Sequence, residues 1–318
     1  MDFGVADFGV ADVRLMQELS QRVFSLRPQI VNNDATVGEL AWVWGKDHAA
    51  QGHSWRRRLW FSPSGDVVAW GWAYLPYQAA RTDGGMVTVP HASLAWQLDP
   101  ARPELLDEIL PWFESVSEGV DRKVSVRAAD EDALARLAAH GYLPDERMLA
   151  DDGYWVQLNW RALDDIASPA LPDGFTFRTA ASAGAEAAVA AHVAAWHPST
   201  FTMRGYEGAR ETWPYRDDLH VLVEAPDGTM VSTAIMWFDE ANRTAEFEPV
   251  GTHQRYRRLG LGKALLLHGM RTVRDAGAER MLVACLGAAG HPAARGLYYS
   301  VGFEPLTREV PHVKRRVA

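Results

Sequence analysis

The segment from Thr252 to Leu267 constrains what this chain can fold into more than any other part of it. It reads Thr-His-Gln-Arg-Tyr-Arg-Arg-Leu-Gly-Leu-Gly-Lys-Ala-Leu-Leu-Leu, in which an extended apolar run ends, two glycines follow, and a helix begins. Gly260 and Gly262 place no side chain between the backbone and a ligand, so successive N–H groups can approach phosphate oxygens at the positive end of the helix dipole. The segment therefore predicts a pyrophosphate-binding loop.

Charge is distributed unevenly around this loop. The stretch from Thr252 to Arg274 has no Asp or Glu, and its basic residues are Arg255, Arg257, Arg258, Lys263, Arg271 and Arg274. Such a stretch attracts an anion. The whole chain carries a formal net charge of -9, which argues against a general nucleic-acid-binding protein. The positive field is therefore local, and it lies where the phosphate-binding loop is expected.

Composition places the chain among globular proteins. It has 318 residues, of which 47% are hydrophobic and 23% charged, and this favours two domains with a sizeable core. The one cysteine, Cys285, cannot form an intrachain disulfide, and the apolar run around it predicts burial in a strand. The segment Met1–Val5 lacks the basic region and apolar core of a signal peptide, and no run of 18 apolar residues occurs. We expect a cytoplasmic protein without a membrane partner.

Periodicity predicts alternating helices and strands in both halves. In the first half we predict helices at 13–24, 37–44, 103–116 and 131–139, and strands between 57 and 72 and at 86–89, 93–97 and 123–127. In the second half we predict strands at 175–178, 219–224, 230–238, 244–252 and 280–286, and a helix at 184–196. Residues 199–218 follow no clear period, which predicts a looser segment rich in aromatic residues.

A short pattern occurs twice. His140-Gly-Tyr-Leu-Pro144 reappears 161 residues later as Val301-Gly-Phe-Glu-Pro305, and each copy follows a short alanine-bearing helix. This spacing is close to half the chain length and is too long for a solenoid repeat, so it predicts an internal duplication. We predict a first unit at 1–163, a linker at 164–174 that contains two prolines and a glycine, and a second unit at 175–318.

Three ordered motifs of the second half resemble one family. Arg257-x-x-Gly260-x-Gly262 resembles the acetyl-CoA loop of the GNAT N-acetyltransferase superfamily, and both the segment 245–252 before it and Ala294-Arg-Gly-Leu-Tyr-Tyr-Ser-Val-Gly-Phe303 after it are similar to that family as well. A plain strand-to-helix turn and a Rossmann dinucleotide site are the alternatives. The Rossmann fingerprint has three glycines, and this loop has two, Gly260 and Gly262.

The resemblance implies a fold and a division of labour. We expect an α/β (α+β) protein of two tandem GNAT-like domains, each a mixed, mostly antiparallel central sheet flanked by helices. A shift of 161 residues places Trp96, Asp99 and Ala101 where the second unit has its loop, and no glycine occurs between Gly85 and Gly119. The first unit also holds 10 of the 13 tryptophans. We expect it to be a degenerate, non-catalytic scaffold, and the second unit to be the catalytic domain.

The resemblance also implies the cofactor and its contacts. Acetyl-CoA is the expected cofactor, and no metal site is expected. In the family the pantetheine arm runs along the strand before the glycine loop, and the loop holds the diphosphate. The matching residues here are Val250, Gly251, Thr252, Arg257, Arg258, Leu259, Gly260, Leu261, Gly262 and Lys263. One residue departs from the pattern: His291 stands where family members often have asparagine, and it is the candidate to replace that contact.

Acetyl transfer to an amine needs a base, polarisation of the thioester and a proton for the leaving thiolate. Glu246 and Glu248 are two residues apart, so a regular strand turns both to one face, whereas Pro249 is typical of a bulge or a broken ladder. By resemblance Glu246 is the favoured base, with Glu248 as the other candidate, because the base of histone-acetyltransferase-like members lies eleven residues before the arginine. Tyr298 matches the tyrosine that protonates the thiolate in the family.

The acceptor is not readable from the sequence beyond a small-molecule amine. The aromatic segment from Phe201 to Tyr215, together with the two glutamates, would suit a cationic amine on an apolar body. We expect a monomer in which two domains form a pseudo-dimer, or a weak homodimer, and no nucleic-acid partner. Two alternatives stay open: a mycothiol-synthase-like acetyltransferase, and a non-catalytic sensor or scaffold that binds acyl-CoA.

Overall fold

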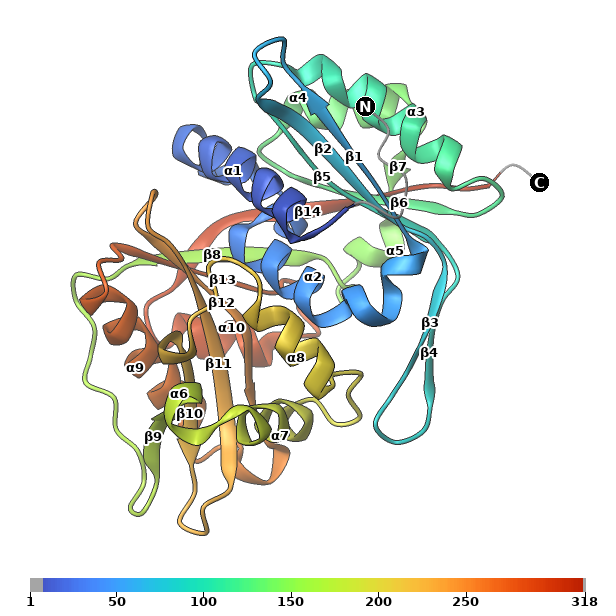
Figure 1. Ribbon diagram of the computed structural model, residues 1–318. Helices are drawn as coiled ribbons and strands as arrows, with labels where there is room; N and C mark the ends of the chain where they lie inside the picture. The colour runs from blue at the N-terminus through green and yellow to red at the C-terminus, as the bar shows by residue number, and fades with distance from the viewer. Residues whose placement is uncertain (1–7, 317–318) are drawn as a thin grey trace.

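The computed structural model describes residues 8–316 (Figure 1). The segment Met1–Val5, on which the expectation of a chain without a signal peptide rests, lies outside the described residues. Within 8–316, no helix combines the length and apolar character needed to cross a membrane.

The first unit packs helices on both faces of its sheet. Its helices are α1 (Val10–Leu26), α2 (Val37–Gln51), α3 (Leu106–Val116), α4 (Glu131–Ala139) and α5 (Glu146–Leu149). Its strands are β1 (Trp55–Phe61), β2 (Val67–Tyr74), β3 (Tyr77–Ala80), β4 (Met86–Val89), β5 (Ala92–Leu98), β6 (Arg122–Arg127), β7 (Leu143–Pro144) and β8 (Val156–Ala162). Alternating strand residues divide between two cores, with Trp70 and Trp72 under α1 and α2, and Ala69 and Ala73 under α3 and α4.

The second unit repeats this layering. Its helices are α6 (Ala180–Ala183), α7 (Ala185–Ala195), α8 (Met203–Arg210), α9 (Leu261–Asp275) and α10 (Pro292–Tyr299). Its strands are β9 (Thr176–Thr179), β10 (His220–Glu224), β11 (Met230–Asp239), β12 (Thr244–Thr252), β13 (Arg280–Leu286) and β14 (Glu304–Lys314). Helix α9 packs on one face of β11 against Met236, whereas α7 and α8 pack on the other face against Ile235 and Trp237.

The strands of residues 8–316 form a 12-stranded sheet with the order β1-β2-β5-β6-β14-β8-β13-β12-β11-β10-β9, with β7 paired beside β14, and a separate hairpin of β3 and β4. Each unit has one parallel pair, β5 with β6 and β12 with β13, and the other pairs of the large sheet are antiparallel. The predicted mixed, mostly antiparallel sheet flanked by helices is confirmed. The two central sheets are continuous with each other, which the sequence did not predict.

The continuity arises because the units exchange their last strands. The first part of β14, Glu304 to Arg308, pairs with β8, and its second part, Glu309 to Lys314, pairs with β6 of the first unit. Strand β8 in turn pairs with β13 of the second unit. Figure 1 shows β14 and β8 running side by side through the middle of the molecule. The linker predicted at 164–174 therefore follows a strand that is hydrogen-bonded within the second unit's sheet.

Helix α2 of the first unit crosses α8 of the second at two glycines. A Cβ added at Gly45 would lie 2.3 Å from the Cα of Ala209, and one at Gly208 would lie 2.3 Å from the carbonyl oxygen of Gly45. Trp42 and Tyr206 pack in one buried cluster beside the crossing. The backbones of the two units thus touch without intervening side chains, so the position of one fixes the position of the other.

Replacing Gly45 with alanine should lower the free energy of unfolding by about 1–3 kcal/mol, because overpacking outweighs the gain of roughly 1 kcal/mol that alanine has over glycine within a helix. The matched control is Gly296→Ala in α10, where an added Cβ would meet nothing within 4 Å. Denaturant titration should show a loss for the first variant and a gain for the second. A gain for both would mean that the crossing opens without cost.

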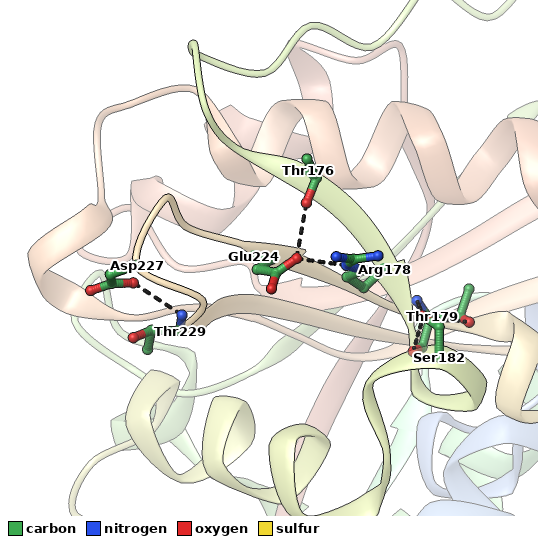
Figure 2. A network of polar contacts seen from close by, with 7 residues as sticks. All are labelled: Thr176, Arg178, Thr179, Ser182, Glu224, Asp227 and Thr229. Carbon is green, nitrogen blue, oxygen red and sulfur yellow. Dashed lines mark hydrogen bonds and ion pairs between the residues drawn. The ribbon is translucent and has the colours of Figure 1, made fainter.

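The far edge of the sheet is held by local polar contacts (Figure 2). The Glu224 carboxylate on β10 accepts hydrogen bonds from Arg178 Nε (2.6 Å) and Thr176 Oγ1 (3.1 Å) of the edge strand β9. The Asp227 carboxylate accepts from the Thr229 N–H at 3.0 Å in the turn that follows. These contacts fix a short edge strand, and they lie on the opposite side of β11 from the strand that carries the candidate site.

Most predicted elements are present, and one prediction is wrong. Helix α4 and strands β4, β12 and β13 have the predicted bounds, and Cys285 is buried on β13 as expected. The segment 199–218, predicted to lack regular structure, contains α8, which is capped at its start by Thr202. Strands β3, β8 and β14 were also not identified from the sequence. The partners of β8 and β14 lie in distant parts of the chain, so local periodicity does not define these two strands. Strand β3 pairs with β4, the next strand along the chain.

Candidate active site

Strand β12 is interrupted at Glu248 and Pro249. Its pairing with β11 extends from Thr244 to Phe247 and resumes at Val250, so two residues of β12 face the single residue Ile235 of β11. The parallel pairing with β13 ends at Phe247. A proline cannot donate to a ladder, and a bulge is where such a residue fits. The predicted bulge is confirmed, and β12 diverges from β13 after Phe247, which opens the sheet beside Glu248.

A groove of about 600 Å³ follows the diverging end of β12, and we call it the donor groove. Its lining comes from the end of β12, the segment after it, the start of α9 and one side of α10. Its size is that of a small-molecule site. The predicted site residues that line it are Val250, Gly251, Thr252, Arg257, Arg258, Gly260, Leu261, Gly262, Lys263 and Tyr298.

The start of α9 is suited to a phosphate group. Gly260 has a φ of 82°, which favours glycine, and the space where its Cβ would lie is open. The helix begins with the hydrogen bond from the Ala264 N–H to the Gly260 carbonyl, so the N–H groups of residues 261–263 precede the helical ladder. Arg258 and Lys263 line the same groove. The donor groove therefore fits the diphosphate of a coenzyme.

Tyr298 projects from α10 into the donor groove, and 6% of its surface is exposed. Burial raises the pKa of its phenol, and the neighbouring carboxylate of Glu248 raises it further. The group therefore holds its proton at neutral pH and is able to donate it. The adjacent Tyr299 is 39% exposed and is not part of the groove's lining.

The two glutamates of β12 lie in different surroundings, because the bulge separates side chains that a regular strand would keep together. Glu248 is partly exposed and lines a second cavity of about 300 Å³. Burial and the charge of Glu246 raise the pKa of Glu248 to about 8, and Lys46 opposes the rise. This second cavity, which we call the acceptor cavity, adjoins the donor groove through consecutive residues of β12, Pro249 and Val250.

Glu246 is only 6% exposed and lies against the start of α2. Its carboxylate accepts hydrogen bonds from Thr36 Oγ1 (2.8 Å) and from the Gly38 N–H (3.0 Å). Burial raises the pKa of Glu246 to about 7, and these two bonds oppose the rise. The space beside it is a pocket of about 30 Å³, which is too small for a substrate.

Residues 187–303 match the family model described as "Acetyltransferase (GNAT) family". This range contains β12, the glycine loop and Tyr298. Residues 187–303 form a GNAT acetyltransferase domain. The protein is therefore an acyltransferase, and the remainder of its chain is compared below through its fold.

The fold of the whole chain is similar to that of solved GNAT proteins. A tandem GNAT protein from the clavulanic acid biosynthesis pathway aligns with a TM-score of 0.65 at 16% identity, over 100% of this chain and 98% of that one. A GCN5-related N-acetyltransferase from Sphaerobacter thermophilus aligns with a TM-score of 0.57 at 19% identity, over 97% of this chain and 94% of that one. These similarities concern the fold, and they support two GNAT-like units in tandem.

A curated relative is similar in sequence over part of the chain. The mycothiol acetyltransferase of Saccharomonospora viridis is 29% identical over 215 residues, which are 64% of this chain and 68% of that protein. The alignment is longer than the GNAT domain itself.

Two residues predicted from the GNAT pattern to contact the coenzyme lie elsewhere. Leu259 is 48% exposed and is not part of the donor groove's lining. His291 lines a different cavity, where its Nε2 lies 3.4 Å from the Asp152 carbonyl oxygen and its ring packs on Tyr154. Pro292 begins α10 directly after this histidine.

Two other predicted contacts of the GNAT loop also have packing roles. Gly251 makes room for Trp196, since an added Cβ would lie 2.4 Å from that ring. The Arg257 guanidinium donates to the carbonyl oxygens of Thr252 (3.1 Å) and Ala195 (3.4 Å), which ties the loop to the ends of β12 and α7. These contacts hold the loop in shape before any coenzyme binds.

The acceptor cavity is built by both units. The first unit contributes Trp42 and Lys46 of α2 and Arg81 and Val87 of the β3–β4 hairpin, and the GNAT domain contributes His192, Trp196, Phe201, Glu248 and Pro249. The hairpin docks on the second unit through two hydrogen bonds, from the Thr82 N–H to the Ser199 carbonyl oxygen (2.7 Å) and from the Ser199 N–H to Thr82 Oγ1 (3.0 Å). Burial lowers the pKa of His192 to about 3, so its ring is neutral and stacks on Trp196.

Sequence patterns did not identify the first unit's share of this cavity. The tryptophans of that unit are mostly core residues, with Trp55, Trp70, Trp72 and Trp96 fully buried, and Trp42 alone among these five lines the cavity. The high tryptophan count was a signal for one wall of an acceptor pocket, but it could not single out a residue. Lys46 and Arg81 carried no signal of their own.

The aromatic segment from Phe201 to Tyr215 contributes less to the cavity than predicted. Phe201 lines it, whereas the hydroxyls of Tyr206 and Tyr215 hydrogen-bond to each other at 2.7 Å and lie next to His220 Nδ1. Burial lowers the pKa of His220 to about 3, so this network is neutral. It anchors α8 to β10 and supports the cavity from behind.

Proposed function

We propose that this GNAT enzyme transfers an acetyl group from acetyl-CoA to the amine of a small-molecule acceptor. The observation that carries the proposal is the position of Glu248 between two cavities. Glu248 and Pro249 line the acceptor cavity, and the next residue, Val250, lines the donor groove that also contains Tyr298. A base and an acid that face one opening between two bound molecules provide the geometry that group transfer needs.

When bound, acetyl-CoA supplies an acetyl group activated as a thioester. The N–H groups of residues 261–263 would hold its diphosphate, with Arg258 and Lys263 beside them. Backbone groups of Val250 and Thr252 would orient the arm that leads to the thioester, because β12 has left its parallel partner at that point. Two features support the fit to this coenzyme: the glycine loop, which has no side chain at Gly260 and Gly262, and β12, which diverges from β13.

Two side chains transfer protons in the proposed reaction. Glu248 takes a proton from the acceptor amine as the nitrogen–carbon bond forms, and Tyr298 gives a proton to the leaving sulfur as the carbon–sulfur bond breaks. A pKa of about 8 makes Glu248 a stronger base than an ordinary carboxylate, and the raised pKa of Tyr298 keeps its phenol protonated until that step. Glu246, the base favoured by the spacing, is held by α2 and takes no part in proton transfer.

The acceptor cavity favours a small molecule with an apolar part. Trp42, Trp196 and Phe201 supply flat apolar walls, and a volume of about 300 Å³ admits neither a duplex nor a folded protein domain. We propose a monomer, in which the first unit replaces a second subunit, because the exchanged strands and the α2–α8 crossing already supply that interface.

A sugar-linked cysteinyl amine is a second candidate acceptor. It is favoured by the 29% identity to a mycothiol acetyltransferase over 215 residues. This candidate keeps the same donor, the same two proton-transferring residues and the same cavity.

The proposed function predicts selective stabilisation by one donor. Acetyl-CoA and CoA should each raise the melting temperature of the protein, by an amount that grows with ligand concentration, and NAD should leave it unchanged. A panel of aromatic, aliphatic and sugar-linked amines, followed by mass spectrometry, should then yield an acetylated product. A shift with NAD alone would overturn the assignment of the groove, and coenzyme binding without turnover of any amine would favour a sensor.

A further inference from the structure

The contact between Glu246 and α2 joins the two units at the strand that carries the candidate base. Thr36 Oγ1 donates to Glu246 Oε1 and the Gly38 N–H donates to Oε2, so each carboxylate oxygen has its own donor from a segment 208 to 210 residues away. Both donors lie at the start of α2, which Figure 1 places between the units. A carboxylate at the N-terminus of a helix is stabilised by the helix dipole as well as by these bonds.

The local sequence is suited to this contact. Thr36 is the N-cap of α2, and its Oγ1 accepts from the Glu39 N–H (3.3 Å). Its hydroxyl lies 2.8 Å from Glu246 Oε1 and 3.3 Å from the Asn33 carbonyl oxygen, so its shorter bond is to Glu246. Gly38 must lack a side chain, because an added Cβ would lie 2.6 Å from Glu246 Oε2 and 2.7 Å from the Trp237 ring. The first unit thus presents a hydroxyl and a bare N–H at one point, and β12 brings a carboxylate to both.

The consequence for the site is a difference between two carboxylates on one strand. Each oxygen of Glu246 accepts one hydrogen bond from the first unit and the side chain borders the 30 Å³ pocket, whereas Glu248 borders the acceptor cavity. We propose that the start of α2 is a positioning element for acetyl transfer: it holds Glu246 away from both cavities and leaves Glu248 as the one β12 carboxylate that faces the acceptor. This inference rests on the proposed function, and it gives the first unit a role in the reaction beyond that of a scaffold.

Charge in this region couples the two glutamates. Glu39 and Lys46 of α2, Arg127 of β6 and Tyr298 of α10 interact with one or both glutamates. Arg81 after β3 and His192 of α7 line the acceptor cavity beside Glu248. Asp34 before α2 and Glu309 of β14 face Arg127. The bonds from Thr36 and Gly38 favour the anion of Glu246, and that anion raises the pKa of Glu248. Loss of the Thr36 bond should therefore raise the pKa of Glu246 and lower that of Glu248.

The test is Thr36→Val, which keeps the shape of the side chain and removes the hydroxyl. The matched control is Asp130→Ala, which removes another N-cap of the first unit, the one that accepts from the Ala133 N–H in α4, without contact to Glu246. Carboxyl resonances of ¹³C-labelled glutamate are followed from pH 5 to 9 in the resting protein without donor or acceptor, and are assigned with Glu246→Gln and Glu248→Gln. Both cap variants should lose a similar amount of thermal stability, and only Thr36→Val should move the Glu248 midpoint, by about one pH unit downward.

A midpoint for Glu248 that is the same in Thr36→Val, in the control and in the unaltered protein would overturn the inference, because the cap would then be structural only. A second readout uses turnover of an amine from the acceptor panel. Glu246→Gln should keep activity within about tenfold of the unaltered protein, since it removes no proton-transferring group, and loss of all activity in this variant would also refute the inference. Because the titration needs no turnover, a failure of acetyl transfer itself would be recognised separately.

Discussion

Replacing Glu248 with glutamine should lower kcat by about 10²–10⁴-fold and leave the KM for acetyl-CoA nearly unchanged. Glutamine keeps the shape of the side chain but cannot accept the proton of the acceptor amine, and general base catalysis contributes about this much to rate. The carboxylate borders the acceptor cavity and not the donor groove, so coenzyme binding should persist. Steady-state kinetics with an amine that the protein acetylates, at saturating acetyl-CoA, measures the effect.

The pH dependence follows from the raised pKa of this base. Because the reactive form of Glu248 is the carboxylate and its pKa is about 8, kcat/KM should rise about tenfold per pH unit below that value and level off above it. In Glu248→Gln this rise of kcat/KM with pH should vanish. Glu240→Gln, the same change at an exposed glutamate after β11, is the control and should keep the rise. A Glu248→Gln variant with full activity, beside an inactive Glu246→Gln, would return the role of base to Glu246.

Much of the fold could be predicted because its patterns are local. The alternation in 244–252 and 280–286 defined β12 and β13, and the helical period in 131–139 defined α4, with the bounds that the structure has. The duplicated Gly-aromatic pattern indicated two units of similar fold. What the sequence could not give is the exchange of β8 and β14, because strand pairing across 150 residues depends on the register of both partners and not on either segment alone.

Helix α8 shows the same limit at a smaller scale. It has eight residues, and two of them, Gly205 and Gly208, disfavour helix. In the structure those glycines are required, because an added Cβ at either would lie within 3 Å of the backbone of α2. The two glycines that the packing requires are therefore the residues that keep helix propensity from predicting α8.

The candidate site likewise has two parts. One part is predicted by a sequence motif, and the other is brought together only by the fold. The glycine loop, Arg257 and Tyr298 follow from a contiguous pattern, and all of them line the donor groove. The choice between Glu246 and Glu248 depended on a bulge and on a helix from the other unit, so spacing alone favoured the residue that α2 holds out of reach. Lys46 and Arg81 line the acceptor cavity from the first unit, where the sequence has no GNAT motif that could have identified them.

Replacing Gly260 with aspartate should raise the Kd for acetyl-CoA about 100-fold, which is about 2.7 kcal/mol, without unfolding the protein. Aspartate is among the residues that tolerate a positive φ, and the space at this position is open, so the backbone can keep its φ of 82°. The new carboxylate would stand at the start of α9, where it competes for the N–H groups that the diphosphate needs and repels the phosphates.

Gly65→Asp is the matched control for Gly260→Asp. Gly65 has a φ of 93° in the turn between β1 and β2, and an added Cβ there would also meet nothing within 4 Å, so the two variants bear similar backbone strain. Isothermal titration with acetyl-CoA should show loss of affinity in Gly260→Asp alone, while the melting temperatures of the two variants fall together. Equal affinities in a folded Gly260→Asp would mean that the diphosphate does not bind at the start of α9, and the roles of Val250, Thr252 and Tyr298 would then lack the anchor that places the thioester beside them.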